Sequence, residues 1–172
     1  MTRRISHLAV VYALFMSTAA RAQESKPPQS FMTVIAEDLK CTTPLGSGIF
    51  SVDAWSFGAA IAKGTINAEG IGQANVSDLN IQKKFDDCTP ALFGAVTTSK
   101  HFPSLTLVQQ DKKETLMTVV LTDVVMSSYQ IAGTQTAREP VEAIAISFAK
   151  ICVSDVASGK NVCFDFKTQT SS

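Results

Sequence analysis

Two long apolar runs dominate the pattern of hydrophobic and polar positions along this chain. The first spans residues 116–127 and the second spans residues 141–153, and both are rich in β-branched side chains. The segment between them contains Gly, Thr, Gln and Pro, which disfavours a helix and is typical of a connection. The pattern therefore predicts two long strands joined as a broad hairpin, against which the rest of the domain packs.

The second run alternates bulky and small side chains. A period of two predicts a strand with one packed face, here carrying Ile144, Ile146, Phe148 and Cys152. We expect the opposite face to let a helix or a second subunit approach closely, and we take it as a candidate subunit contact. This small face consists of Ala143, Ala145, Ser147 and Ala149. The first run is apolar on both faces, which predicts a strand covered on both sides.

Shorter segments predict the remaining elements. Strands are expected at residues 31–40, 48–58, 73–83, 104–110 and 161–166. One short helix is expected over residues 90–97, because Pro90 suits the first helical position and Asp86, Asp87 and Thr89 offer capping oxygens before it. Trp55 is expected to anchor the core. Seven or eight strands with one helix predict a mainly β fold: an antiparallel β-barrel or two-sheet sandwich with a short flanking α-helix.

The N-terminal segment has a different character. A basic end at residues 1–4, an apolar run at residues 8–16 and the small-x-small triplet at residues 20–22 are together typical of a secretory signal peptide cleaved between Ala22 and Gln23. The apolar run is shorter than the roughly 20 residues that a membrane span needs. We therefore expect no integral membrane segment and a secreted or periplasmic protein.

The domain boundaries follow from the same pattern. Residues 1–22 are expected to form the signal peptide, residues 23–30 a polar flexible arm, residues 31–167 the β domain and residues 168–172 a polar tail. The leader holds three arginines and no acid, which leaves 12 basic and 15 acidic side chains in the mature chain. A net charge of about −3 without a basic cluster lacks the electrostatic footprint of a nucleic-acid binder. We therefore expect no nucleic-acid partner.

All four cysteines follow the leader, and an even number in an exported chain favours disulfides. Residues 155–160 form a plausible hairpin turn that would place Cys152 opposite Cys163. Cys41 and Cys88 then pair by elimination, closing a loop of roughly 45 residues worth on the order of 4 kcal/mol in the chain-entropy model. The sequence has neither a CxxC motif nor a Cys/His pair at metal spacing, so we expect no redox centre, metal or cofactor.

Candidate catalytic groups are few. His101 is the one histidine outside the leader, and no GxSxG motif surrounds any serine, so a hydrolase triad is not expected. The adjacent Asp86 and Asp87 are better explained as partners of the following helix than as paired acids of a glycosidase. Asp123, in the middle of an apolar run, is either a satisfied buried acceptor or a lock between strands or subunits. We therefore expect no enzyme activity.

Read in order, several segments resemble the haemolysin-coregulated protein (Hcp) family of bacterial type VI secretion systems. The resemblance covers about residues 31–167 and rests on the series rather than on any single motif. The segments are Val52–Gly58, Asn75–Asp86, Thr89–Leu92, Lys100–Phe102, Leu121–Tyr129 and Val141–Ile151.

The resemblance implies a β-barrel of two packed sheets with one flanking helix. It also implies a homo-hexameric ring, whose stack forms a secreted tube that can carry effectors and engage secretion-system components. The leader and the four cysteines depart from the family pattern and indicate export into an oxidising compartment. The predicted function is an exported, ring-forming structural protein without catalysis. The alternative is a disulfide-stapled β-barrel that binds a small ligand or carbohydrate, marked by aromatic side chains lining a cavity.

Overall fold

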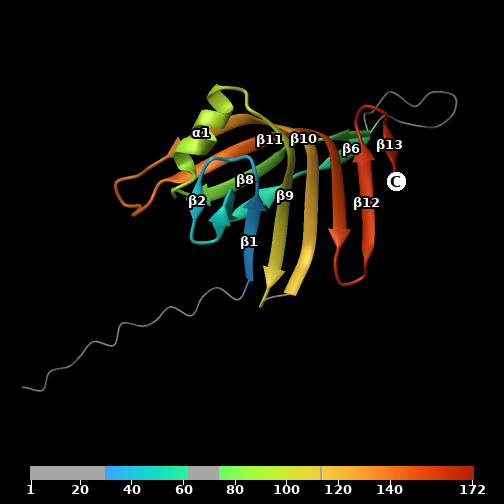
Figure 1. Cartoon of the computed structure of the whole chain (residues 1–172), viewed down its shortest axis with the longest axis horizontal. Coiled ribbons are helices and arrows are strands. Elements are labelled where there is room, and N and C mark those ends of the chain that lie inside the picture. The colour runs from blue at the N-terminus through green and yellow to red at the C-terminus, as the bar shows by residue number, and fades with distance from the viewer. Residues whose placement is uncertain (1–29, 62–73, 113) are drawn as a thin grey trace, which may run out of the picture.

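The computed structural model describes residues 30–61, 74–112 and 114–172, and this part of the chain is mainly antiparallel β-sheet with one short helix (Figure 1). The expected signal peptide, its Ala22–Gln23 cleavage site and residues 23–29 of the expected arm lie outside the described residues. The elements are β1 (Ser30–Ile35), β2 (Thr42–Thr43), β3 (Gly46–Ser47), β4 (Ile49–Val52), β5 (Ala54–Ser56), β6 (Ala59–Ile61), β7 (Ala74–Val76), β8 (Leu79–Lys84), α1 (Thr89–Thr97), β9 (His101–Asp111), β10 (Glu114–Ala132), β11 (Val141–Asp155), β12 (Lys160–Asp165) and β13 (Thr170–Ser171).

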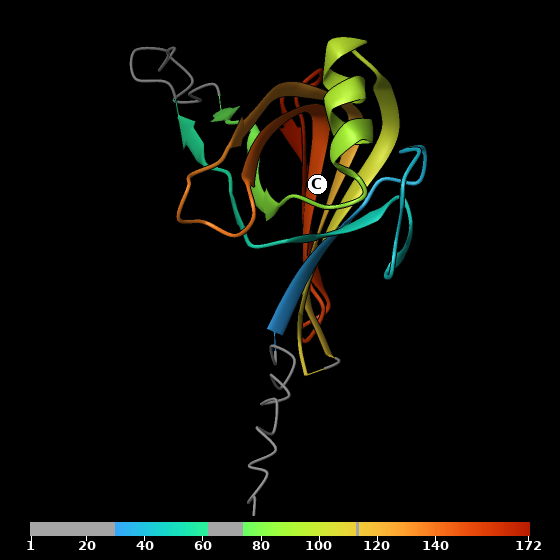
Figure 2. The same ribbon diagram turned by 90° about the vertical axis from the view of Figure 1, so that its left-hand side faces the viewer.

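The long hairpin predicted from the sequence is the centre of the fold. β10 and β11 pair along almost their whole length, from Met117 opposite Asp155 to Ala132 opposite Val141. The main sheet has the order β13-β12-β11-β10-β9-β1-β4, and β8 adds to β11 and carries β5 on its other side. The sheet curls so that β4, β5 and β8 face the long strands across the core (Figure 2).

One edge of β11 serves two different neighbours. Residues 141–146 pair with β8, whereas residues 150–155 pair with β12. The sheet therefore forks near residues 147–149, and the two branches follow different layers. Asp123 of β10 lies opposite this fork and adopts a left-handed backbone conformation, with φ of 61°. Asp is one of the few residues other than Gly that enter this region readily.

The fork also explains why the first apolar run lacks simple alternation. Val119 and Leu121 are buried before Asp123, whereas Val124 and Met126 are buried after it. The left-handed residue shifts the buried face from odd to even positions. Val120 and Val125, which point the other way, are half-buried, and Leu116 is exposed. The expectation of a strand covered on both sides within the chain was therefore wrong.

The predicted helix is present but is capped differently from the expectation. It begins at Thr89, its N-cap is Cys88, and that residue makes no side-chain capping bond. The Asp86 carboxylate instead accepts a hydrogen bond from the Cys88 backbone N–H at 2.8 Å, and the Thr89 hydroxyl accepts one from the Asp86 N–H at 3.1 Å. These side chains thus shape the turn before the helix. The helix buries Leu92 and Ala95 against the sheet.

Several predicted strands are shorter or divided. The strand expected at residues 31–40 ends at Ile35, where the Ala36 N–H donates to the Gly48 carbonyl at 2.8 Å. The segment 48–58 forms two strands, β4 and β5, separated at Asp53. Trp55 is half-buried at the edge of the core and stacks on Phe57 instead of filling its centre. In the expected polar tail, β13 pairs with β12.

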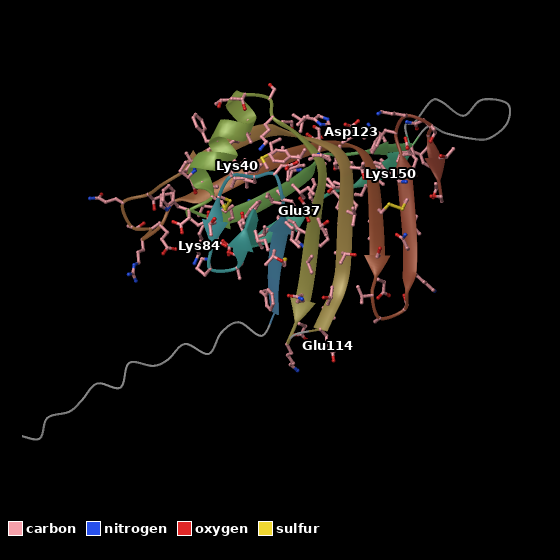
Figure 3. All side chains as sticks on the ribbon, viewed as in Figure 1. Glu37, Lys40, Lys84, Glu114, Asp123 and Lys150 are labelled. Carbon is pink, nitrogen blue, oxygen red and sulfur yellow. A yellow bond between two sulfur atoms is a disulfide. The ribbon has the colours of Figure 1, made fainter. Side chains whose placement is uncertain are left out.

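Two disulfides join the predicted pairs of cysteines (Figure 3). Cys41–Cys88 ties the β2–β3 hairpin to the start of the helix, and Cys152–Cys163 joins β11 to β12 at directly opposite positions. All four cysteines of the sequence are paired. In the three stretches that the structure describes, no helix has the length and apolar character to cross a membrane.

Candidate subunit-contact surface

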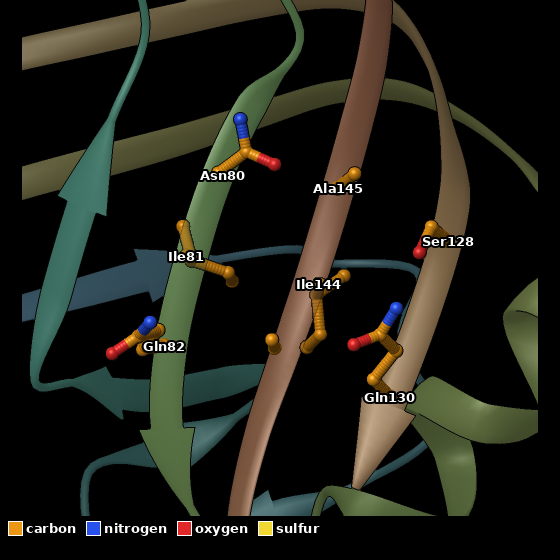
Figure 4. Close-up of a pocket in the computed structure, with 8 residues that line it drawn as sticks. Asn80, Ile81, Gln82, Ser128, Gln130, Ile144 and Ala145 are labelled. Atoms are coloured by element: carbon orange, nitrogen blue, oxygen red, sulfur yellow. The ribbon is translucent and has the colours of Figure 1, made fainter.

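The small face of β11 forms the floor of a shallow hollow on the outside of the molecule (Figure 4). Ala143 lies between Gln82 of β8 and Gln130 of β10, and the next row places Ala145 between Asn80 and Ser128. The hollow has a volume of about 210 Å³. Small side chains below and carboxamides on both rims leave a polar, uncharged depression that another chain can enter closely.

Ser147 extends this row but is engaged within the chain. Its hydroxyl donates to one oxygen of the Asp78 carboxylate at 2.9 Å, and the Ser127 hydroxyl donates to the other oxygen at 2.8 Å. Ala149 lies opposite Asp123, where the buried face of the sheet changes. The structure therefore groups Ala143, Ala145 and Ser147 on one face, and Ala149 marks its end. We call Ala143, Ala145 and Ser147 the alanine row.

Beneath this surface lies a buried ion pair that the sequence analysis missed. Lys83 and Glu142 occupy directly opposite positions on β8 and β11, and their side chains are 1% and 0% exposed. The Lys83 Nζ donates to Glu142 Oε2 at 2.5 Å, to Asp86 Oδ1 at 2.9 Å and to the Lys84 carbonyl at 2.7 Å. The ammonium group thus has three acceptors, which offsets the cost of its burial.

The other oxygen of Glu142 accepts a hydrogen bond from the Tyr129 hydroxyl at 2.6 Å. Burial, followed by this bond and the nearby negative charge, raises the pKa of Tyr129 above its ordinary value. The phenol therefore stays protonated and keeps donating. Because Asp86 also binds the turn before the helix, the network connects β8, β10, β11 and α1 at one point.

A sequence signal for this pair existed. Every second residue of β8 is apolar and faces inward, and Lys83 takes the next inward position after Ile81. In β11, Glu142 takes the inward position before Ile144. Two opposite charges at inward positions of two strands predict a partnership. Their sequence separation of 59 residues hides the pairing until the strand order is known.

His101, the one imidazole considered for catalysis, belongs to a surface ion cluster around Asp123. Its Nε2 lies 2.6 Å from one oxygen of Asp123, and the Lys167 Nζ lies 3.0 Å from the other. Lys167, and to a lesser extent His101, holds the pKa of Asp123 below its ordinary value, although burial acts in the opposite direction. The carboxylate is half-exposed and ties β9 and the end of β12 to the fork, so the lock between strands is the better of the two hypotheses for this residue.

These clusters do not resemble a metal centre. Within the described residues, no three His, Cys, Asp or Glu side chains converge as metal ligands do. The acids Asp86 and Asp87 border a second hollow with Thr43, Pro44 and Leu45. Asp86 is already engaged by Lys83 there.

Comparison with known structures identifies the fold. Hcp1 from Salmonella typhimurium is 17% identical, the match covers 84% of this chain and 99% of that one, and the TM-score is 0.70. A type VI secretion system effector from Yersinia pestis is 22% identical, with 78% and 98% of the two chains covered and a TM-score of 0.65. The secreted protein Hcp3 from Pseudomonas aeruginosa is 14% identical, with 80% and 97% covered and a TM-score of 0.62.

At these identities the structural matches show a shared fold. None of the curated protein sequences matches the chain. A family model described as "Type VI secretion system effector, Hcp" matches residues 41–154, which is most of the β domain and includes the alanine row and the buried ion pair. The chain therefore belongs to the Hcp family of type VI secretion system effectors.

Proposed function

We propose that the mature chain is exported, oxidised and assembled into a homo-hexameric ring, and that it acts as a structural protein without catalysis. The observation that carries this proposal is the alanine row, a close-approach surface on the outside of a protein that belongs to the Hcp family. Secretion-system components or effectors would be the further partners of such a ring, and rings could stack into a tube.

The disulfides support the location. Two bridges in a chain of this size favour folding in an oxidising compartment, as the sequence of the N-terminal segment also predicts. We expect signal cleavage between Ala22 and Gln23 and a secreted or periplasmic product.

The ligand-binding alternative gains no support from the hollow over the alanine row. Carbohydrate sites use aromatic side chains as flat apolar platforms. This hollow is lined by amide, hydroxyl, alanine and isoleucine side chains. Its lining suits another polypeptide surface better than a sugar ring.

The test is the size and shape of the mature protein, purified from a bacterial periplasm, by sizing with light scattering and by electron microscopy. We expect rings for the wild type and protomers for Ala145→Arg, because a long charged side chain fills the hollow. Ala60→Arg, an exposed alanine on β6, is the matched control and keeps the ring. A wild-type protomer contradicts the ring, whereas rings of Ala145→Arg contradict the role of the alanine row.

A further inference from the structure

The buried ion pair places an amine against a carboxyl group inside the protein. Lys83 and Glu142 lie directly opposite each other on β8 and β11. The Lys83 Nζ is 2.5 Å from Glu142 Oε2, so the carboxyl carbon is one bond beyond the contact. Well-oriented groups within one molecule reach effective molarities of about 10⁵–10⁸ M. The two side chains are therefore positioned to react with each other as well as to attract each other.

The surroundings of the pair favour neutral groups over charged ones. The ring centroid of Phe50, which is fully buried, lies 5.9 Å from the Lys83 Nζ. Ile81 and Ile144, the inward neighbours of the pair along β8 and β11, are each 1% exposed. In such an apolar setting, transfer of one proton from the ammonium to the carboxylate removes two buried charges. The products of this transfer, an amine with a free electron pair and a carboxylic acid, are the forms that condense.

The Tyr129 hydroxyl is positioned to stabilise an oxyanion. It donates to Glu142 Oε1 at 2.6 Å, whereas the Lys83 Nζ contacts Oε2. Attack on the carboxyl carbon would place negative charge on Oε1, which stays, while Oε2 leaves. A donor that already points at the oxygen that stays stabilises this charge without reorganisation. Burial, with the bond to Glu142, raises the pKa of Tyr129, so the phenol keeps the proton that it donates.

The Asp86 carboxylate is positioned to move protons. Its Oδ1 lies 2.9 Å from the Lys83 Nζ, and its side chain is 27% exposed, so it borders both the buried pair and the solvent. The Cys88 backbone N–H donates to the same oxygen at 2.8 Å and holds the carboxylate in place. A carboxylate at this position can accept a proton from an attacking nitrogen and return it to a leaving oxygen.

We propose that Lys83 and Glu142 condense after folding to form an amide between their side chains. The ammonium gives one proton to Oε2, and the neutral amine attacks the Glu142 carboxyl carbon. The nitrogen then gives a second proton to Asp86, which passes it to Oε2, and Oε2 leaves as water. One ammonium and one carboxylate thus become one neutral amide and one water molecule, without any oxidant, reductant or co-reactant.

The product keeps the hydrogen bonds of the site. The Lys84 carbonyl, which accepts from the Lys83 Nζ at 2.7 Å, can accept from the new amide N–H. The Tyr129 hydroxyl continues to donate to the oxygen that becomes the amide carbonyl. No charge of the pair remains in the core, and both polar groups of the amide have partners. The exclusion of water from the site also disfavours hydrolysis of the amide.

Glu142 is a better acyl partner than Asp86, the other carboxylate that contacts the Lys83 ammonium. The Lys83 ammonium and the Cys88 N–H both donate to Oδ1 of Asp86. Attack on Asp86 would therefore leave this donor on the oxygen that departs. On Glu142, the amine and the hydroxyl donor contact separate oxygens, as the reaction requires.

The proposed bond would hold the part of the fork that the disulfides leave free. Cys152–Cys163 joins β11 to β12, and Cys41–Cys88 joins the β2–β3 hairpin to the start of α1. Neither bridge joins β8 to β11. An amide between Lys83 and Glu142 would do so and would close a loop between residues 59 apart in the sequence. This inference does not depend on the proposed ring.

Peptide mapping of the wild-type protein tests the bond directly. The protein is purified from a bacterial periplasm, incubated at neutral pH, reduced and digested, and its peptides are sequenced by tandem mass spectrometry. We expect a branched peptide that joins Lys83 to Glu142 and whose mass is one water below the sum of its two arms.

Adjacent lysines provide the matched variants. Lys83→Arg keeps a cation at the buried position but replaces the amine, and we expect it to give linear peptides alone. Lys84→Arg changes a lysine that is 64% exposed and should keep the branched peptide. Circular dichroism establishes that both variants are folded.

The rate of condensation tests the roles of the neighbouring groups. Time courses begin when chain made as inclusion bodies is refolded from urea, because the unfolded chain lacks the assembled site. Tyr129→Phe removes the hydroxyl donor, and Asp86→Asn removes the proton acceptor. Each is expected to slow the appearance of the branched peptide by on the order of 100-fold. Unchanged rates in both folded variants overturn these roles.

The remaining outcomes bear on the bond itself. Linear peptides alone from the folded wild type refute it. A branch from Lys83 to Asp86, or a loss of water confined to a linear peptide, refutes its assignment to Glu142. None of these results depends on the size of the assembly, so they leave the proposed ring to its own test.

Discussion

At the scale of single residues, the constraint at Gly48 is the most direct. Its φ is +67°, and a Cβ atom there would lie 2.4 Å from the Ala36 carbonyl oxygen. That oxygen belongs to fixed backbone, so it cannot move aside cheaply. We expect Gly48→Ala to lower the free energy of unfolding by about 2 kcal/mol or more in urea titrations. Gly94→Ala, in the helix with open space around it, should leave stability unchanged or raise it by about 0.5–1 kcal/mol. Equal stability of the two variants contradicts this account.

The buried ion pair predicts a contrast between adjacent lysines. Lys83→Met leaves the Glu142 carboxylate buried without its cation, and we expect it to cost about 3–5 kcal/mol of unfolding free energy. Lys84→Met removes an exposed lysine paired with Glu139 and should cost about 0–1 kcal/mol. Adding Glu142→Gln to Lys83→Met should recover part of the loss, because the uncompensated charge disappears. Denaturant unfolding of the three variants measures these differences. If Lys83→Met costs no more unfolding free energy than Lys84→Met, the predicted role of the buried ion pair is contradicted.

The ion cluster around Asp123 predicts that the stability of the folded protein depends on pH in the acidic range. Because Lys167 and His101 lower the pKa of Asp123 from 3.8, its ion pairs stabilise the folded state above that pH and are lost as the pH falls through the folded-state pKa. Asn also tolerates a left-handed backbone, so Asp123→Asn should keep the fold. Between about pH 5 and pH 3, unfolding free energy should fall less in Asp123→Asn and in Lys167→Met than in the wild type. An unchanged acid slope in both variants argues against the cluster.

At the scale of elements, the two disulfides should act on different parts of the molecule. Cys152→Ser with Cys163→Ser opens a loop between residues 11 apart, worth about 2–3 kcal/mol in the chain-entropy model. Its amide hydrogen exchange should increase most in β12 and β13, which that bridge attaches to β11. Cys41→Ser with Cys88→Ser opens a longer loop and should loosen the β2–β3 hairpin and the start of α1 instead. Identical exchange patterns in the two double variants would show that neither bridge acts locally.

The sequence predicted strands correctly where the alternation of inward and outward side chains continues along the whole strand, and it predicted them wrongly where that alternation shifts. The alternation from Val141 to Ser147 gave both the strand and its small face. The prediction for the strand around Asp123 was wrong because the left-handed backbone of this one residue switches the buried and exposed faces of the strand. The backbone conformation of a single residue does not appear in the hydrophobic pattern of the sequence. The predicted helix capping was wrong for a different reason: the same oxygen of Asp86 accepts from both the Lys83 ammonium and the Cys88 backbone N–H, so Asp86 shapes the turn before the helix and does not cap it.

At the scale of the whole molecule, the mainly β fold, the flanking helix and the family followed from the ordered series of segments. The Lys83–Glu142 pair and the exposure of Val162 on β12 did not, because both depend on which strands neighbour one another. Val162 alternates like any core valine, and only the fork of the sheet at β11 leaves it without a covering layer. Features that arise from strand order therefore required the structure.

The central claim is that this protein works by joining copies of itself. The most direct measurement is native mass spectrometry, at neutral pH, of the oxidised protein that starts at Gln23, the residue proposed as the first of the mature chain. The account predicts a mass of six protomers that drops to one protomer in Ala145→Arg. A wild-type mass of one protomer under the same conditions would contradict it.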